Sequence, residues 1–273
     1  MQVINDKYHD LSGYSEEFFK SDPFPYVVLK NFLRPDFFAS LQEVFAKTDD
    51  TKKGKTFKSV AEEKKWISLN CSLPNATKMI IDDLNSEVWV KNLRTFIGDD
   101  SLAITDVGNT SLANFHVMSP GGVLGPHVDH SSEPNLGFPH VLNIIVCLSE
   151  KWDDTNGGAT LLYNKDGSEL VTRVPFEPNQ AIVFLHTPYS FHGVERIASN
   201  SQNLRRTIYV DYYSRSLQPY INMNLKFERK WFRHVTTFKL NWTEYFKLRN
   251  KNYVKAMLGY QVNRLRSKLS RPI

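Results

Sequence analysis

The fold and the function of this chain are decided around one stretch, GGVLGPHVDH at residues 121–130. Side chains on a strand alternate between its two faces, so His127 and Asp129 point to one side while Val128 and His130 point to the other. An imidazole and a carboxylate on the same face can bind one metal ion. Two histidines and one carboxylate on one side of a metal form the ligand set of non-haem Fe(II) sites. The stretch therefore predicts two of three metal ligands.

Short β-type runs separated by turn residues surround this stretch. They lie at residues 112–118, 123–130, 141–148, 159–163, 170–174, 181–186 and 207–213. Asn156-Gly157-Gly158 and Asp166-Gly167 supply the positive φ values that tight turns between strands require. Regular short strands at this spacing are typical of a sandwich or barrel. The pattern predicts a mainly β core over residues 104–214, with flanking helices.

Residues 1–103 have a different, partly helical pattern. Residues 24–33 predict a strand that enters a turn, residues 51–65 predict a lysine-rich surface loop, and the polar residues 1–22 predict no element. Helices are predicted from Pro35, at about 75–85 and at about 86–97. Their apolar stripes are Phe37, Phe38, Leu41, Val44 and Phe45 in the first, and Val88, Trp89, Leu93, Phe96 and Ile97 in the last, with Gly98 just past its end. We expect this part to pack on the β core.

The net charge of +5 hides an asymmetry along the chain. Residues 215–273 contain fourteen Lys and Arg against two acids, a net charge of +12, whereas the rest contains twenty against twenty-seven, a net charge of −7. Apolar residues recur at helical intervals within residues 241–273, among basic ones. They are Val254, Leu258, Val262, Leu265 and Leu269, interspersed with Arg264, Arg266, Lys268 and Arg271. We expect a basic helical C-terminal extension that packs on the core; the alternatives are contact with an acidic partner, an anionic membrane surface or RNA.

Composition places the chain among folded proteins, since 41% of its residues are hydrophobic and 23% are charged. No run of about eighteen apolar residues predicts a transmembrane segment, and residues 1–10 lack the apolar segment of a signal peptide. We therefore expect a cytoplasmic protein. Cys71 and Cys147 are far apart in sequence and fit no C-x-x-C pattern, so we expect two core thiols rather than a disulfide.

Two histidines compete for the third ligand position. His186 ends the apolar run 181–185, whereas His192 follows a turn at Thr187-Pro188. His192 is favoured because a small residue and a β-branched residue follow it, which is typical of a strand that resumes after a turn.

Thirteen residues after His192, an arginine pair opens the run 207–213. On a strand, Arg205, Thr207 and Tyr209 share one face, and Arg206 lies on the other. An arginine that points inward is costly to bury unpaired, and its guanidinium suits a planar carboxylate. Strand parity with Thr207 favours Arg205 as the inward residue, and Arg206 is the alternative.

At these residues the chain resembles the Fe(II)- and 2-oxoglutarate-dependent oxygenases, specifically their prolyl 4-hydroxylase-like branch. The elements that carry the resemblance are G-x-x-x-x-P-H-x-D ending at Asp129, Gly157-Gly158, S-x-H-x-V around His192, and Arg205-x-Thr207. The resemblance covers about residues 110–214 well and extends loosely back to residue 24. It implies a double-stranded β-helix (jelly-roll) core, with an N-terminal part of 1–103, a catalytic core of 104–214 and an extension of 215–273.

The resemblance also implies the roles of individual residues. His127, Asp129 and His192 would bind Fe(II), and Arg205, helped by Thr207, would bind the distal carboxylate of 2-oxoglutarate. His116, like Asn143 and Tyr163, would line the co-substrate pocket or be an ordinary core residue. The implied reaction hydroxylates an unactivated C–H bond with O2 and releases succinate and CO2.

Two other classes of function stay open at this point. A metal-binding β-barrel of the cupin type, acting as an isomerase or binding protein, would more often use an H-x-H pair and has no need of Arg205. A noncatalytic interaction protein would act through its basic extension. The substrate of an oxygenase would be a small molecule or a peptidyl residue, with a prolyl or related amino-acid side chain preferred.

Overall fold

One long bent strand, β5 (Ala113–Val128), organises the fold. Its first half pairs with β11 (Arg205–Ser214), where Met118 lies opposite Arg205, and its second half pairs with β10 (His192–Val194). Gly121, at a φ of +80°, lies between the two halves. The strands predicted at 112–118 and 123–130 are therefore the two halves of one strand that passes from one layer of the sheet to the other.

The computed structural model describes most of the chain. The residues described are 2–47, 55–57, 62–68, 75–103, 113–133, 137–225 and 237–239. Residue 112, Cys71 and the extension predicted at 241–273 lie outside them. In the part that is described, no helix combines the length and the hydropathy that crossing a membrane requires.

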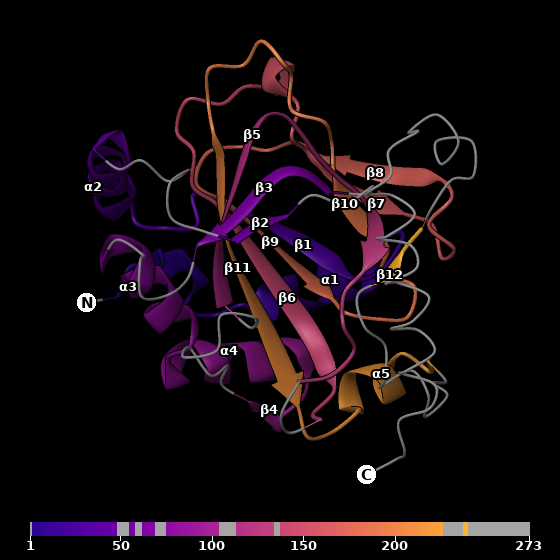
Figure 1. The fold of residues 1–273 in the computed structure, drawn as a ribbon. Coiled ribbons are helices and arrows are strands. Elements are labelled where there is room, and N and C mark those ends of the chain that lie inside the picture. The colour runs from indigo at the N-terminus through magenta and orange to yellow at the C-terminus, as the bar shows by residue number, and fades with distance from the viewer. Residues whose placement is uncertain are drawn as a thin grey trace.

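The sheet curls into the predicted double-stranded β-helix (Figure 1). All its strand pairs are antiparallel, and many strands that are hydrogen-bonded to each other, such as β1 (Tyr26–Lys30) and β9 (Gln180–Leu185), lie far apart in the sequence. The order is β1, β9, β6 (His140–Cys147), β11, β5, β10, β7 (Thr160–Tyr163) and β8 (Leu170–Val174). Off this path, β3 (Glu62–Ser68) and β12 (Thr237–Phe238) pair with β5, β2 (Lys55–Phe57) pairs with β3, and β4 (Leu102–Ala103) pairs with β11.

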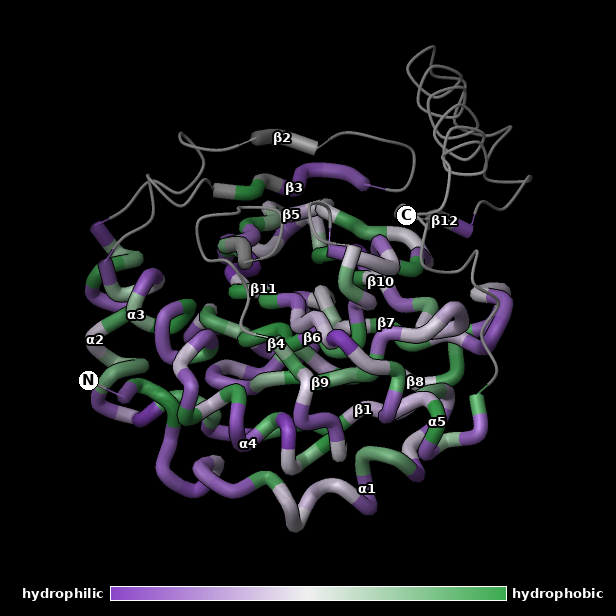
Figure 2. The backbone as a smooth tube through the Cα atoms, turned by 90° about the horizontal axis from the view of Figure 1, so that it is seen from below, coloured by the Kyte–Doolittle hydropathy of each residue, from purple (hydrophilic) through white to green (hydrophobic). Residues whose placement is uncertain are grey.

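Helices cover one side of this sheet. They are α1 (Ser15–Lys20), α2 (Pro35–Ala46), α3 (Asn75–Leu84), α4 (Glu87–Ile97) and α5 (Gln218–Asn222), with short 3₁₀ turns at Asp6–Tyr8, Ser12–Tyr14 and Asp154–Asn156. Figure 2 shows α1 and α4 beneath the layer that contains β1 and β9, on the side away from β3 and β5. The largest hydrophobic cluster joins the helices to this layer. The barrel interior stays available for polar side chains.

The helix ends follow from local chemistry. Ser86 caps the N-terminus of α4 by accepting the Trp89 N–H, and Gly98 ends the helix in the left-handed conformation at a φ of 67°. The stripe predicted for this helix is wrong at Val88, which is 59% exposed, while Val90 is buried in its place. Val88 precedes the buried Trp89 by one position, so it turns away from the face that packs on the core.

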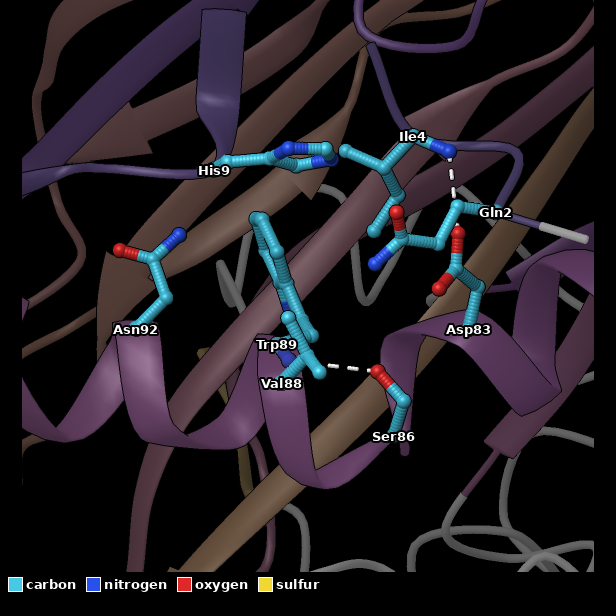
Figure 3. A pocket seen from close by; sticks show the side chains of 8 residues that line it. All are labelled: Gln2, Ile4, His9, Asp83, Ser86, Val88, Trp89 and Asn92. Atoms are coloured by element: carbon cyan, nitrogen blue, oxygen red, sulfur yellow. Dashed lines mark hydrogen bonds between the residues drawn. The ribbon is translucent and has the colours of Figure 1, made fainter. Parts of the chain in front are cut away.

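The N-terminal segment contributes more to the core than its polar composition predicts. Val3, Ile4 and Phe18 are buried. The carboxylate of Asp83 anchors the first two by accepting the backbone N–H groups of Val3 at 2.7 Å and Ile4 at 3.0 Å. A small surface pocket lies beside this contact (Figure 3). Asp83, the carboxylate that lines this pocket, already accepts two backbone N–H groups. We therefore assign Asp83 the role of anchoring the N-terminal segment and not of binding a ligand.

The described residues of the lysine-rich segment 51–65 form strands and not a surface loop. Residues 55–57 and 62–68 form β2 and β3, and β3 pairs along β5 from Glu62 opposite Leu124 to Ser68 opposite Phe115. Lys65 is only 9% exposed, and its ammonium pairs with Glu62 Oε1 at 3.3 Å. The prediction was wrong because pairing with a neighbouring strand, which the segment's composition does not encode, orders its backbone.

Candidate active site

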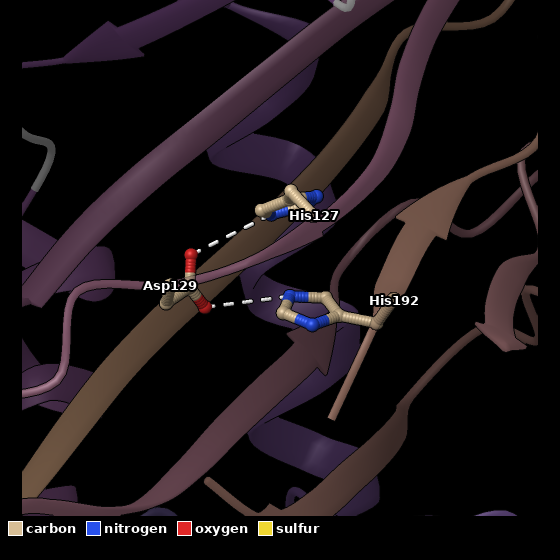
Figure 4. Close-up of side chains that lie close together, drawn as sticks. All are labelled: His127, Asp129 and His192. Carbon is tan, nitrogen blue, oxygen red and sulfur yellow. Dashed lines mark ion pairs between the residues drawn. The ribbon is translucent and has the colours of Figure 1, made fainter. Parts of the chain in front are cut away.

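Three side chains from two neighbouring strands converge inside the barrel (Figure 4). His127 lies near the end of β5, Asp129 follows it on the same face, and His192 begins β10 directly opposite His127. His127 Nε2 is 3.5 Å from Asp129 Oδ1, and His192 Nε2 is 3.3 Å from Asp129 Oδ2. Both imidazoles are nearly inaccessible, at 4% exposure. Each residue therefore offers one ligand atom toward a common point, which suits a metal ion.

Backbone carbonyls fix the orientation of both imidazoles. His127 Nδ1 donates to Gly125 O at 2.9 Å, and His192 Nδ1 donates to Ser190 O at 3.0 Å. This directs each Nε2 toward the Asp129 carboxylate, an arrangement that is also found in histidines that bind metals. Gly193 permits the close approach of β10, since a Cβ there would lie 2.6 Å from Leu124 O. The sequence between the two histidines thus folds so that both face one carboxylate.

The protonation states also suit a metal. Burial raises the pKa of Asp129, but His192 and His127 outweigh it and hold that pKa well below its usual range. Burial, together with neighbouring His192, lowers the pKa of His127. An ionised carboxylate beside a neutral imidazole is the state in which these groups bind cations.

The other candidate for the third ligand lies elsewhere. His186 donates from Nε2 to the backbone carbonyl of Asp129 at 3.2 Å, not to its carboxylate, and its ring stacks on His140 at 4.2 Å. His192 is the histidine that the fold brings to the Asp129 carboxylate. The ligand roles themselves stay predictions.

Arg205 lies inside the barrel with only part of its guanidinium satisfied. It is 3% exposed, donates from Nε to Gly158 O at 2.8 Å, and stacks over Phe176 with 4.7 Å from Cζ to the ring centre. Nη2 is buried and has no hydrogen-bond partner among the described residues. Burial lowers the pKa of Arg205 to about 10, so the group is cationic at neutral pH. Its free donor calls for an anion.

Arg206 points the other way, as strand parity predicts. Its guanidinium stacks on the ring of Phe45, a residue of α2, at 4.8 Å. Thr207, which shares the face of Arg205, is 2% exposed. Arg205 and Thr207 therefore face the barrel interior together, on the strand next to the half of β5 that contains His116.

His116 and Tyr209 lie on the paired strands β5 and β11, near both Arg205 and Asp129. Their rings stack at 5.5 Å with 14° between the planes, and His116 Nε2 is buried without a hydrogen-bond partner in the described part of the chain. Burial, then the charges of Lys65 and Arg205, lower the pKa of His116 well below its usual value, so the ring is neutral. Tyr209 donates its hydroxyl to Asp129 Oδ2 at 2.8 Å.

Two of these neighbours were not assigned from the sequence. Tyr209 could have been found, because it shares the strand face of Arg205 and Thr207, which points at the same interior. Lys65 could not, because only the pairing of β3 with β5 brings it near His116. Asn143 donates to the hydroxyl of Tyr209 at 2.5 Å and so belongs to the same hydrogen-bond chain, whereas Tyr163 lies on β7 and is half-buried.

Replacing Gly158 with alanine should move Arg205. Gly158 adopts a φ of +73°, and an added Cβ would lie 3.0 Å from Trp152 Cζ2 and 3.1 Å from Arg205 Cδ. The backbone conformation alone costs about 1–2 kcal/mol for an L-residue, and the contacts add strain next to the guanidinium. We expect a lower melting temperature and several-fold weaker binding of a dicarboxylate, measured by calorimetric titration.

Gly137→Ala is the matched control. Gly137 has a similar φ of +71° but nothing within 4 Å of the added Cβ. It should lose stability through the backbone alone and keep its affinity for the dicarboxylate. Equal affinities in both variants would mean that Gly158 does not position Arg205.

Cys147 should be inert in the folded protein. It is fully buried, and burial raises the pKa of its thiol to about 12. The reactive thiolate is then roughly one part in ten thousand at pH 8. We expect iodoacetamide to leave the peptide that contains Cys147 unmodified until urea unfolds the chain, as measured by mass spectrometry. Labelling of the native protein at the rate of a free thiol would contradict the burial of Cys147.

Comparison with known proteins agrees with this geometry. Residues 113–214 match the family model of the 2OG-Fe(II) oxygenase superfamily. None of the curated proteins matches the chain in sequence. The matched segment begins with β5 and ends with β11, so it contains the triad and Arg205.

Solved structures share the fold at low sequence identity. A Pseudomonas putida prolyl-4-hydroxylase has a TM-score of 0.54 at 15% identity, over 76% of this chain and 100% of that one. A Phytophthora capsici prolyl 4-hydroxylase has a TM-score of 0.55 at 15% identity, over 84% and 72%. HygX from Streptomyces hygroscopicus, solved with nickel and 2-oxoglutarate, has a TM-score of 0.51 at 11% identity, over 74% and 86%. At these identities the similarity shows the jelly-roll fold.

Proposed function

We propose, from the premise that residues 113–214 form a domain of the 2OG-Fe(II) oxygenase superfamily, that this chain hydroxylates an unactivated C–H bond of a prolyl or related amino-acid side chain. The superfamily uses Fe(II), with 2-oxoglutarate and O2 as co-substrates. On this proposal His127, Asp129 and His192 hold Fe(II), and Arg205 binds the distal carboxylate of 2-oxoglutarate.

The observation that carries the proposal is the partly satisfied Arg205. A buried guanidinium is costly unless hydrogen bonds and an anion compensate for its lost hydration. In the part of the chain that the structure describes, Arg205 forms one hydrogen bond, to Gly158, and Nη2 has none. A carboxylate bound there would satisfy it. A metal-binding isomerase or a noncatalytic barrel has no use for such a cation.

We propose that the co-substrate extends inside the barrel from the triad to Arg205. His116, with its free and buried Nε2, and Thr207, on the face of Arg205, are proposed to line this path. A neutral His116 can donate to a carboxylate oxygen without adding a charge. We also propose that residues 104–214 are the catalytic core, that residues 1–103 are an N-terminal part that packs on it, and that residues 215–273 are a C-terminal extension.

The residues of the chain prepare the site for the reaction. Bound Fe(II), with 2-oxoglutarate and O2, supplies the oxidant that inserts one oxygen atom into a C–H bond, while 2-oxoglutarate becomes succinate and CO2. Tyr209 holds Asp129 Oδ2, which keeps the carboxylate turned toward both imidazoles. Phe184 packs against His192, with ring centres 4.8 Å apart, and keeps water from the inner side of the ligand. These contacts restrict the side-chain rotamers of Asp129 and His192 before the metal ion or the co-substrate binds.

A peptidyl prolyl side chain is our preferred substrate class. Two structures of similar fold are prolyl 4-hydroxylases, and a third, from Trichoplax adhaerens, is a prolyl hydroxylase in complex with a peptide. HygX, whose fold is also similar, was solved with hygromycin B, so the fold also accommodates small molecules. A panel of proline-containing peptides against free amino acids separates these classes.

One spectrum tests the proposal. Anaerobic addition of 2-oxoglutarate to the Fe(II)-loaded protein should produce a weak visible charge-transfer band, because the chelate of iron and keto acid absorbs. Succinate should then accumulate after admission of O2, faster with a peptide from the panel. A protein that binds Fe(II) but yields neither the band nor succinate would be a metal-binding barrel of another function.

A further inference from the structure

A second cluster of two histidines and one aspartate lies on the strands that form the triad. His130 follows the end of β5, His140 begins β6, and Asp211 lies on β11. His140 Nε2 is 3.2 Å from Asp211 Oδ1, and His130 Nε2 is 3.6 Å from Asp211 Oδ2. The side chains of His140 and Asp211 are inaccessible, while that of His130 is 24% exposed, which leaves one route to solvent.

These separations repeat those of the triad. The nitrogen-to-oxygen distances are 3.2 and 3.6 Å in the second cluster and 3.3 and 3.5 Å in the triad. Nitrogen and oxygen ligands that lie about 2.0–2.2 Å from one ion are roughly 3–3.5 Å from each other. In both clusters one atom of each residue lies close enough to the others to share an ion.

The orientation of His140 suits a metal ligand. His140 Nδ1 donates to the His130 carbonyl at 2.8 Å, so Nε2 is the free atom, as in His127 and His192. Nε2 is buried and, among the described residues, makes no hydrogen bond, although Asp211 Oδ1 is only 3.2 Å away. With its proton on Nδ1, a neutral His140 presents a lone pair at Nε2 to the nearby carboxylate oxygen, and a cation between the two atoms would stabilise this pair.

The charge of Asp211 also favours a cation. Asp211 accepts hydrogen bonds from Asn143 Nδ2 at 2.9 Å and from the hydroxyl of Tyr213 at 3.2 Å. Both of these donors are neutral side chains, and a cation at the cluster would add an attraction that they do not supply. The Tyr213 hydroxyl is also hydrogen-bonded to His130 Nε2 at 2.7 Å, so a metal ion bound by His130 would replace this hydrogen bond.

We propose that His130, His140 and Asp211 form a second metal site that binds a divalent first-row transition-metal ion, separately from the triad. Two imidazole nitrogens and a carboxylate suit such ions, of which zinc is the most frequent in closed sites. Residues 131–139 join β5 to β6, and His130 and His140 lie at the two ends of this segment. The ion would connect both ends to Asp211 on β11. The alternative to a metal ion is a proton on His140. Burial lowers the pKa of that ring, but the adjacent Asp211 carboxylate outweighs burial, so that the pKa lies above its usual value.

The two sites are linked but separable. Asn143 donates both to Asp211 Oδ1 and to the hydroxyl of Tyr209, which in turn donates to Asp129. No residue belongs to both ligand sets. The second site can therefore be tested in a protein whose triad has been removed, and the result does not depend on the proposed oxygenase function.

Cobalt(II) is the probe, because its visible spectrum reports coordination by nitrogen and oxygen. The full chain, without a histidine tag and stripped with a chelator, is titrated anaerobically while bound metal is counted by elemental analysis. We expect two equivalents in the unaltered protein and one in His127→Ala/His192→Ala. Adding His140→Gln or, separately, Asp211→Asn to that double variant should reduce the count to none.

His186→Gln in the same double variant is the matched control. His186 stacks on His140 and is equally buried but is not in the ligand set, so this variant should keep one equivalent. One equivalent in the unaltered protein with none in His127→Ala/His192→Ala, from pH 6 to 8, would overturn the proposal and assign the neutralising charge to a proton on His140. An equivalent that survives both His140→Gln and Asp211→Asn would be adventitious and would also overturn it.

Discussion

Replacing His192 with alanine should abolish turnover of 2-oxoglutarate, measured as succinate released by the Fe(II)-loaded protein. His192 Nε2 and His127 Nε2 flank the Asp129 carboxylate, and no other described imidazole reaches it. Loss of a residue that merely supports a metal ligand costs roughly 10- to 100-fold in affinity or activity. Removing a ligand itself should exceed that, and His127→Ala and Asp129→Ala should be equally inactive.

His186→Ala is the control for this prediction. His186 is buried near Asp129, but it donates to the backbone carbonyl of that residue and not to its carboxylate. The variant should be less stable, because removal of the imidazole leaves a cavity. It should still bind Fe(II), because all three residues of the triad are unchanged. Fe(II) binding that survives His192→Ala and vanishes in His186→Ala would transfer the third ligand position to His186.

Arg205→Ala should have the second large effect, on 2-oxoglutarate and not on iron. Breaking a buried, hydrogen-bonded charge pair on one side costs about 3–5 kcal/mol, which corresponds to roughly 100- to 4,000-fold in the dissociation constant. Fe(II) affinity should change little, because the hydrogen bond of Arg205 is to Gly158 and its ring contact is to Phe176, neither of which belongs to the triad. Anaerobic titration of the charge-transfer band measures both constants.

Arg206→Ala is the matched control on the next position of the same strand. Its guanidinium packs on Phe45 outside the barrel, so its loss should cost some stability and leave the affinity for 2-oxoglutarate unchanged. An equal loss of affinity in both variants would refute the assignment to Arg205. So would an Arg205→Ala protein that binds 2-oxoglutarate normally.

The sequence by itself determined the features that depend on local periodicity. Strand alternation put His127 with Asp129, and Arg205 with Thr207, on shared faces, and the structure has both pairs turned inward. Helical spacing and a terminal glycine located α4 to within a residue or two. The spacing of short strands predicted a sandwich or barrel, and the resemblance around Asp129 implied the jelly-roll.

The tertiary structure alone decided which distant residues meet. The register of β10 against β5 sets His192 opposite His127 and leaves His186 behind the Asp129 backbone. Pairing of β3 with β5 turned a lysine-rich loop into a strand and buried Lys65. Asp211 comes beside His130 and His140 only because β11 pairs with β6. Such contacts depend on strand register and burial across the whole chain, and no local run of residues encodes either.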